Sequence, residues 1–272
     1  MASKVGTSGR WLLLKSIVTA IICHPLMGRL IGLVWANKIP HRGNRIEVPV
    51  GGDPRVNAML FWGIYESAES RFVQRYLGND LDVIELGSSL GGVSCQIAKK
   101  LAGRKKLVCV EANGQIHQLL RRNVLNNAPD QEVHFLQGAV DYSGKDTIEL
   151  IMGENNLSSR VDDGAEAALT KMTVPTLTLS GVLDLNKMGD YALVSDIEGA
   201  EAGMFVRDSQ AFSRCKRMLI ELHETIYNDK RYTVQALIEL INANTGMILR
   251  DRYGSVCVFE KQDSNSKEYS QK

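Results

Sequence analysis

The chain has 272 residues, is 44% hydrophobic and carries a formal net charge of +1. This composition excludes a largely disordered chain and allows one large domain, or one domain with an extension. Its five scattered cysteines form no C-x-x-C pair, which argues against a disulfide scaffold and predicts reduced core thiols in a cytoplasmic protein.

The amino terminus is basic and apolar. The first 46 residues contain seven basic and no acidic residues, which leaves 25 basic against 31 acidic residues in the remainder. Trp11, Val18 and Ile22 follow helical spacing, whereas Lys15 and Arg29 interrupt the apolar run before it could span a bilayer. We expect residues 1–50 to be a helical extension. It either caps the main domain or makes a peripheral contact with the cytoplasmic face of a membrane through residues 10–36.

The following segments predict an α/β domain over residues 51–262 and a disordered tail over 263–272. Short runs rich in Val, Ile and Leu alternate with helical stretches, which indicates a mostly parallel sheet with helices on both faces. Residues 146–153 and 170–179 predict a surface excursion and a return strand, and residues 247–250 and 255–260 predict a final antiparallel pair. The expected strands are 81–86, 106–112, 132–140, 191–198 and 216–223, and the expected helices are 53–77, 91–102, 115–127 and 233–244.

A glycine-rich turn follows the first strand. Glu85, Gly87 and Gly91 lie in "ELGSSLGG", and Glu111 ends the second strand. Glycines let a ligand approach the backbone, and an acid after the second strand can bind both hydroxyls of a ribose. The turn does not read G-x-G-x-x-G, and the chain has no G-x-x-x-x-G-K-[ST] loop. The combination is typical of a class I S-adenosylmethionine-dependent methyltransferase, whose Rossmann-like sheet has seven strands with an antiparallel last strand.

The chain also resembles the FkbM family of methyltransferases from about residue 63 to residue 259. The resemblance rests on "YESAE", "DVIELGSSLGGVS", "VEANGQIHQLLRRNVLNN", "GAVDYSG", "VSDIEGAE" and "LIELHE". Where the family often has Asp, Lys and Pro, this chain has Glu85, Ser195 and Ala112. The resemblance implies that the cofactor S-adenosylmethionine contacts Glu85, Gly87, Ser88, Gly91, Glu111, Ala112, Ala139, Val140 and Asp196. Tyr65 and Glu66 would come from a segment that covers it.

Carboxylates gather after the fourth and fifth strands. Asp196 and Glu198 follow one strand, and Glu221 and His223 end the next. Carboxylates this close together need a positive charge nearby, and three sources are possible. They are the sulfonium cofactor, a substrate proton taken by Asp196 or His223, and a divalent metal bound by Asp196, Glu198 and His223. The spacing is not diagnostic of a metal, so we assign none and name Asp196, His223 and Glu198 as catalytic. Glu198 and Glu201 could instead serve the start of a helix, and His223 could be a solvated loop residue.

These residues predict O-methylation of a sugar, a glycan or another small hydroxylated substrate, and the extension resembles that of family members found with polysaccharide biosynthesis. A protein that keeps the fold only as a scaffold, at a membrane or in a complex, is the alternative from another class. A nucleotide-dependent oxidoreductase is a further one. The chain has no basic and aromatic array for nucleic acid, so we expect no such partner. The sequence predicts no oligomeric state.

Overall fold

The computed structural model describes residues 18–152, 159–161 and 171–261. Contacts divide the chain into two units, Met1–Tyr65 and Glu66–Lys272. The sequence placed this boundary earlier, between residues 50 and 51, so the first part of the predicted 53–77 helix groups with the N-terminal unit. The predicted tail at 263–272 lies outside the described residues, as does the start of the predicted amphipathic helix.

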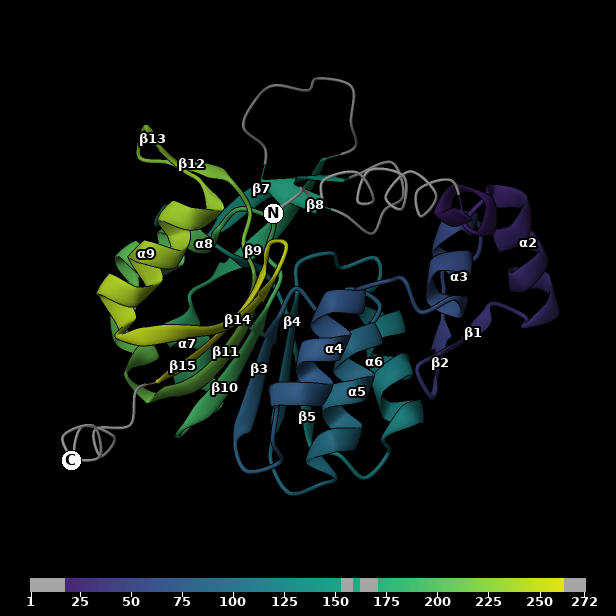
Figure 1. The fold of residues 1–272 in the computed structure, drawn as a ribbon, viewed down its shortest axis with the longest axis horizontal. Helices are drawn as coiled ribbons and strands as arrows, with labels where there is room; N and C mark the ends of the chain where they lie inside the picture. The colour runs from purple at the N-terminus through teal and green to yellow at the C-terminus, as the bar shows by residue number, and fades with distance from the viewer. Residues whose placement is uncertain (1–17, 153–158, 162–170, 262–272) are drawn as a thin grey trace, which may run out of the picture. The chain divides into compact units, whose positions relative to one another are not determined.

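The N-terminal unit combines two short helices with a hairpin. Helix α2 (Pro25–Val34) packs against α3 (Pro54–Phe61), and strand β1 (Lys38–His41) pairs antiparallel with β2 (Asn44–Glu47) (Figure 1). Each helix begins with proline, whose missing N–H costs nothing in the first turn, and the preceding side chain accepts a capping hydrogen bond. Among the described residues, no helix is long and apolar enough to cross a membrane.

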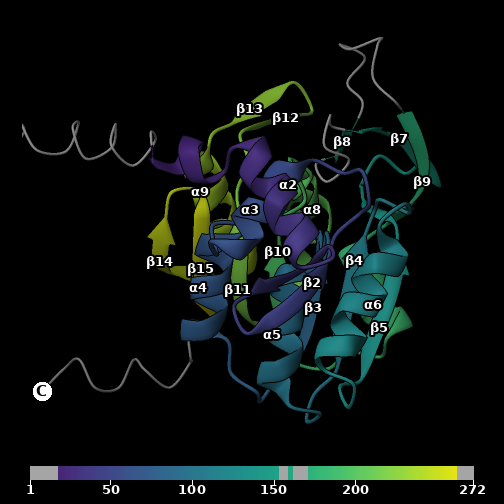
Figure 2. The same ribbon diagram turned by 90° about the vertical axis from the view of Figure 1, so that its right-hand side faces the viewer.

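A seven-stranded sheet forms the centre of the second unit. Its order is β14-β15-β11-β10-β3-β4-β5, which Figure 2 shows from left to right. The strands β3, β4, β5, β10 and β11 are parallel, and β15 runs antiparallel to both of its neighbours. The predicted α/β class, with a mostly parallel sheet and an antiparallel last strand, is confirmed. The strands are β3 (Asp82–Leu86), β4 (Leu107–Glu111), β5 (Val133–Gln137), β10 (Tyr191–Ser195), β11 (Cys215–Glu221), β14 (Met247–Tyr253) and β15 (Val256–Lys261).

Helices cover both faces of this sheet (Figure 1). One layer comprises α4 (Ser67–Tyr76), α5 (Gly92–Leu101) and α6 (His117–Asn127), and the other comprises α7 (Leu179–Leu185), α8 (Glu201–Arg207) and α9 (Val234–Thr245). Because both faces are covered, the central strands are apolar throughout; Val83, Ile84, Leu107 and Val108 are fully buried. A hydrophobic core lies between the sheet and the second layer, where the ring centroids of Phe205 and Phe212 are 4.9 Å apart.

A smaller sheet accounts for the predicted surface excursion. Its order is β6-β9-β7-β8, formed by β6 (Ala139–Val140), β9 (Lys171–Leu177), β7 (Thr147–Met152) and β8 (Ser159–Val161). The prediction of a single strand over 132–140 is therefore wrong. Strand β5 ends at Gln137, and Ala139–Val140 form a separate strand, β6, which pairs with β9. A hairpin of β12 (Thr225–Tyr227) and β13 (Lys230–Tyr232) was not predicted.

The strand register aligns the carboxyl ends of the central strands. Leu86 of β3 lies opposite Val110 of β4 and Ser195 of β10, and Ser195 lies opposite Ile220 of β11. The following residue of each strand therefore falls in one row along one edge of the sheet, namely Gly87, Glu111, Asp196 and Glu221. The chain order reverses between β3 and β10, which is the position where open α/β sheets bind ligands.

Candidate functional site

The glycine turn is pressed against the end of β10. Gly87 has φ +81°, and a Cβ at this position would lie 1.8 Å from the backbone oxygen of Asp196. Its own N–H donates to Val110, while Asp196 donates its N–H to Leu86. Only glycine fits this conformation and this spacing. At the carboxyl ends of β3, β4 and β10, the turn therefore contacts both neighbouring strands through backbone atoms.

Glu111 closes the same turn from β4. One carboxylate oxygen accepts the backbone N–H of Ser89 at 2.7 Å, and the other accepts that of Asn113 at 2.7 Å. Burial raises the pKa of Glu111, and these backbone donors act against the rise. Glu111, the residue predicted to bind the ribose, is thus in direct contact with the glycine turn. From the sequence, the two were expected to lie close together only because each stands at a strand end.

Glu85 lies in the interior. Its carboxylate accepts hydrogen bonds from Ser94 of α5 and, at 3.6 Å, from the thiol of Cys109 on β4. Burial raises the pKa of Glu85 to about 7, although hydrogen bonds from Ser94, Ser88 and Cys109 oppose it. This carboxyl group ties the strand to the helix that follows. Its contact with a cofactor stays a prediction.

The other residues predicted at the cofactor are mostly buried. Ala139 and Val140, expected near the adenine, are each 6% exposed and belong to β6. Ala112 packs with Ala139 on a small apolar cluster. Ser88 is buried and donates to the backbone oxygen of Glu85 at 3.5 Å. Their positions follow the glycine turn, and their contacts with a cofactor also stay predictions.

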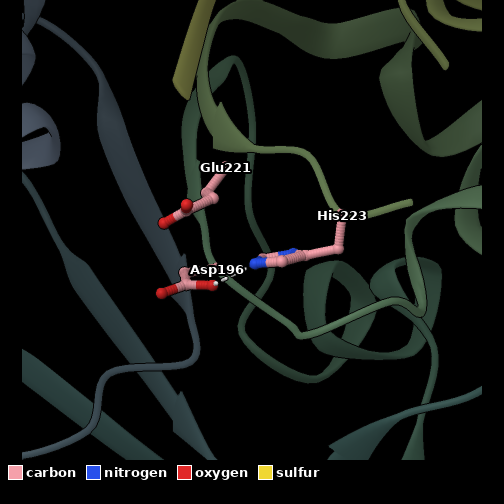
Figure 3. A group of neighbouring side chains, drawn as sticks. All are labelled: Asp196, Glu221 and His223. Atoms are coloured by element: carbon pink, nitrogen blue, oxygen red, sulfur yellow. Dashed lines mark ion pairs between the residues drawn. The ribbon is translucent and has the colours of Figure 1, made fainter. Parts of the chain in front are cut away.

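Acidic side chains and one histidine converge after β10 and β11, and Figure 3 shows Asp196, Glu221 and His223 pointing toward one another. The Nε2 atom of His223 lies 3.7 Å from Oδ1 of Asp196 and 3.6 Å from Oε2 of Glu198. Its Nδ1 lies 2.7 Å from Oε1 of Glu201, which is fully buried at the start of α8. All three residues predicted as catalytic are therefore brought together.

Two residues of this cluster were given no role from the sequence, although Glu221 was expected at the end of the fifth strand. Glu221, at the end of β11, accepts the hydroxyl of Ser255 at 2.7 Å, and Glu69 approaches it from the first turn of α4. The place of Glu221 at a strand end is a sequence signal; Glu69 has none besides the "YESAE" stretch of the family resemblance. Glu198 stands in a left-handed turn with φ +50°, and the structure agrees with Glu201 as a first-turn acid.

The crowding of carboxylates shifts several pKa values upward. Burial, reinforced by the charge of Glu221, raises the pKa of Asp196 to about 8. Burial and the neighbouring Glu221 raise the pKa of Glu69 to about 7. Burial lowers the pKa of His223, but Glu201, Asp196 and Glu198 outweigh it and raise the value to about 9. At neutral pH the cluster therefore retains protons that a bound cation would displace.

The cluster also has the donor types that a divalent ion requires. One ligand atom each from Asp196, Glu221 and His223 lies within 4.8 Å of the others. Oxygen and imidazole donors suit several divalent metals. The set differs from the one considered from sequence, since Glu221 takes the place of Glu198. Acidic groups at this spacing are equally explained by proton sharing, so the geometry alone does not select a metal.

Comparisons with known proteins give a family and remote structural likenesses. Residues 88–250 match the family model described as "Methyltransferase FkbM domain". No curated protein matches the chain significantly. A methyltransferase from Pyrococcus furiosus is 14% identical with a TM-score of 0.43, and the match covers 87% of this chain and 97% of that one.

Two further solved structures are similarly distant. Aeropyrum pernix fibrillarin with natively bound S-adenosyl-L-methionine is 11% identical, with a TM-score of 0.43 and coverage of 71% of this chain and 72% of that one. An uncharacterized protein of Listeria monocytogenes serotype 4b is 9% identical with a TM-score of 0.43. That match covers 71% of this chain but only 66% of the Listeria protein. Likenesses this remote carry no argument about function.

Proposed function

This chain belongs to the FkbM family of methyltransferases, and on that premise we propose that it moves a methyl group from S-adenosylmethionine to a hydroxyl oxygen. The acceptor in this proposal is a sugar, a glycan or another small hydroxylated molecule. The single observation that carries it is the row formed by Gly87, Glu111, Asp196 and Glu221 at the switch point of the sheet.

The residues of this row fit the cofactor in two ways. Both carboxylate oxygens of Glu111 accept backbone N–H groups, which fixes the carboxylate beside the glycine turn. Gly87 keeps side-chain atoms away from the backbone that a ligand would approach. In the proposed complex, Glu111 accepts the two ribose hydroxyls, and the acidic cluster stabilises the positive charges. When bound, the cofactor supplies an electrophilic methyl group on a cationic sulfur.

Asp196 is the residue to which we assign the substrate proton. Among the residues that the structure describes, its buried Oδ1 atom has no hydrogen-bond partner. A carboxylate whose pKa is raised to about 8 is a stronger base than an ordinary one, and general bases work best near the operating pH. A base next to the acceptor hydroxyl would remove the proton as oxygen attacks the methyl group.

His223 suits a positioning role better than that of the base. Its pKa of about 9 keeps the ring protonated at neutral pH, so it has no free lone pair to accept a substrate proton. The hydrogen bond from Nδ1 to Glu201 fixes the ring and leaves Nε2 facing Asp196. In the proposal, His223 holds Asp196 in place, and Glu198 adds negative charge at the edge of the cluster.

The test is transfer of labelled methyl groups from S-adenosylmethionine to a panel of hydroxylated sugars and glycan precursors. Asp196→Asn should lower turnover by about 10²–10⁴-fold, the usual contribution of a general base, while affinity for S-adenosylhomocysteine changes little. Asp190→Asn is the matched control, because Asp190 lies beside the opposite end of β10, exposed and paired with Lys216 at 3.1 Å. It should keep full activity.

Three outcomes would contradict the proposal. Full activity of Asp196→Asn would remove this residue from the mechanism. Binding of the cofactor without transfer to any hydroxyl would contradict O-methylation. A rate that EDTA abolishes and Mg²⁺ restores would make Asp196 a metal ligand instead of the base.

A further inference from the structure

Helix α2 of the N-terminal unit has one face that is fixed by close packing. Gly28 and Gly32 face α3, and a Cβ on Gly28 would lie 1.7 Å from the backbone oxygen of Pro54. Asn57 of α3 donates its side-chain amide to the backbone oxygen of Gly28 at 3.1 Å. Ile31 is buried between these two glycines in the helix turn. The orientation of α2 on α3 is therefore set, and so is the face that it turns outward.

The outward face of α2 is as apolar as the buried one. Leu26, Leu30, Leu33 and Val34 are 64%, 55%, 80% and 66% exposed, and their spacing places them on one side of the helix. Ile21, in the helical residues just before α2, is 63% exposed. Isolated exposed leucines are ordinary, but a continuous apolar stripe indicates an interaction surface.

Tryptophan and basic side chains belong to the same unit. Trp35 follows α2 directly and is 36% exposed, and Trp62 is 46% exposed with its indole N–H bound to the backbone oxygen of Ile22. Residues 1–65 contain eight basic and two acidic residues, whereas the chain as a whole is nearly neutral. Arg29 and Lys38 are exposed within and just after α2. Trp, Leu and basic residues together are the composition of a surface that lies in the headgroup layer.

We propose that the outward face of α2 docks this protein on an anionic membrane surface, with the helix lying in the plane of the interface. The ten residues of α2 are about 15 Å long, half the thickness of a bilayer core, so the helix cannot span it. Apolar side chains enter the acyl boundary, and the positive charge of the unit is attracted to acidic headgroups. A protein surface would supply the apolar contact, but it would leave the charge excess of this unit unexplained.

The test is sedimentation of the full chain with vesicles of phosphatidylcholine alone and of phosphatidylcholine mixed with phosphatidylglycerol. The wild-type protein should bind the mixed vesicles more tightly, and added salt should weaken binding because it screens the headgroup charge. The double substitution Leu30→Ser and Leu33→Ser should weaken binding about a hundredfold, since each leucine contributes about tenfold when buried.

Two further variants test whether binding depends on this particular apolar face and on the basic residues near it. Leu185→Ser is the matched control, because Leu185 ends α7 in the other unit and is 65% exposed; it should bind vesicles like the wild type. Arg29→Gln with Lys38→Gln should weaken binding to mixed vesicles about thirtyfold and leave binding to neutral vesicles unchanged. All substituted side chains are exposed, so melting temperatures should stay near the wild-type value, which shows that the variants fold.

Absence of vesicle binding by the wild type would overturn the proposal. Equal binding by the wild type and the double leucine variant would do so as well, since it would move the contact to another part of the chain. A concentration-dependent dimer that the leucine substitutions break, without vesicle binding, would instead make this face an interface between two copies.

Discussion

Glu111→Ala is the substitution whose effect follows most directly from the site. In the structure the carboxylate accepts two backbone N–H groups at 2.7 Å, from Ser89 in the glycine turn and from Asn113. In the proposed complex it also accepts the two ribose hydroxyls. A hydrogen bond to a charged group contributes about 1.5–3 kcal/mol, so the loss of two ribose contacts should cost about 3–6 kcal/mol of binding. This corresponds to about 10²–10⁴-fold weaker affinity.

The assay is calorimetric titration with S-adenosylhomocysteine, with thermal unfolding to show that the variant folds. Glu132→Ala is the matched control. Glu132 precedes β5, at the amino ends of the parallel strands and away from the row that contains Glu111. Its side chain is 61% exposed and lies 4.0 Å from Lys106. Its removal should leave affinity unchanged. Wild-type affinity in folded Glu111→Ala would refute the ribose contact.

The remaining predictions concern the glycine turn and the titration of Asp196. Gly87→Ala should destabilise the protein by about 3 kcal/mol or more and abolish cofactor binding, because the added Cβ meets the backbone oxygen of Asp196 at 1.8 Å in a left-handed conformation. Gly144 has the same left-handed conformation, with φ +80°, and no described residue lies within 4 Å of a Cβ added there. Gly144→Ala should therefore cost only about 1 kcal/mol in thermal unfolding, and equal effects of the two substitutions would show that the close contact with Asp196 does not matter. For the wild type, kcat/KM should rise with pH and level off above about 8, because the base is the deprotonated form of Asp196, whose pKa is raised to about 8. The rise of kcat with pH should occur at lower pH than that of kcat/KM, because the bound cationic cofactor lowers the pKa of Asp196. A rate independent of pH between about 6 and 9 would refute the assignment of Asp196 as the base.

Local sequence signals predicted the part of the site that depends on strand ends. Buried apolar runs located β3 and β4. Gly87, which follows β3, and Glu111, which ends β4, were predicted as site residues because a parallel sheet gathers its carboxyl ends at one edge. The contact between the glycine turn and Glu111 follows from these strand ends alone, because β3 and β4 are neighbours in the sheet. The family resemblance pointed to the same residues independently.

Other features depend on tertiary arrangement. Glu69 reaches Glu221 across the interface of α4 with the sheet, more than a hundred residues apart in sequence, and no local pattern encodes that contact. The protonation of His223 has the same origin, because its pKa reflects how many carboxylates surround it in space. The β12–β13 hairpin is different. Asn228 and Asp229 both adopt left-handed φ at its turn, and these residue types are a local sequence signal for such a hairpin.

In the proposed complex the adenosyl group lies between the glycine turn and Glu111, at the position where the strand order of the sheet reverses. A crystal structure of the complex with S-adenosylhomocysteine tests it most directly. Both ribose hydroxyls should lie within hydrogen-bond distance of the Glu111 carboxylate, and the methionine part should lie against the backbone of the turn near Asp196. A ligand bound elsewhere, with Glu111 contacting only Ser89 and Asn113, would contradict this position of the cofactor.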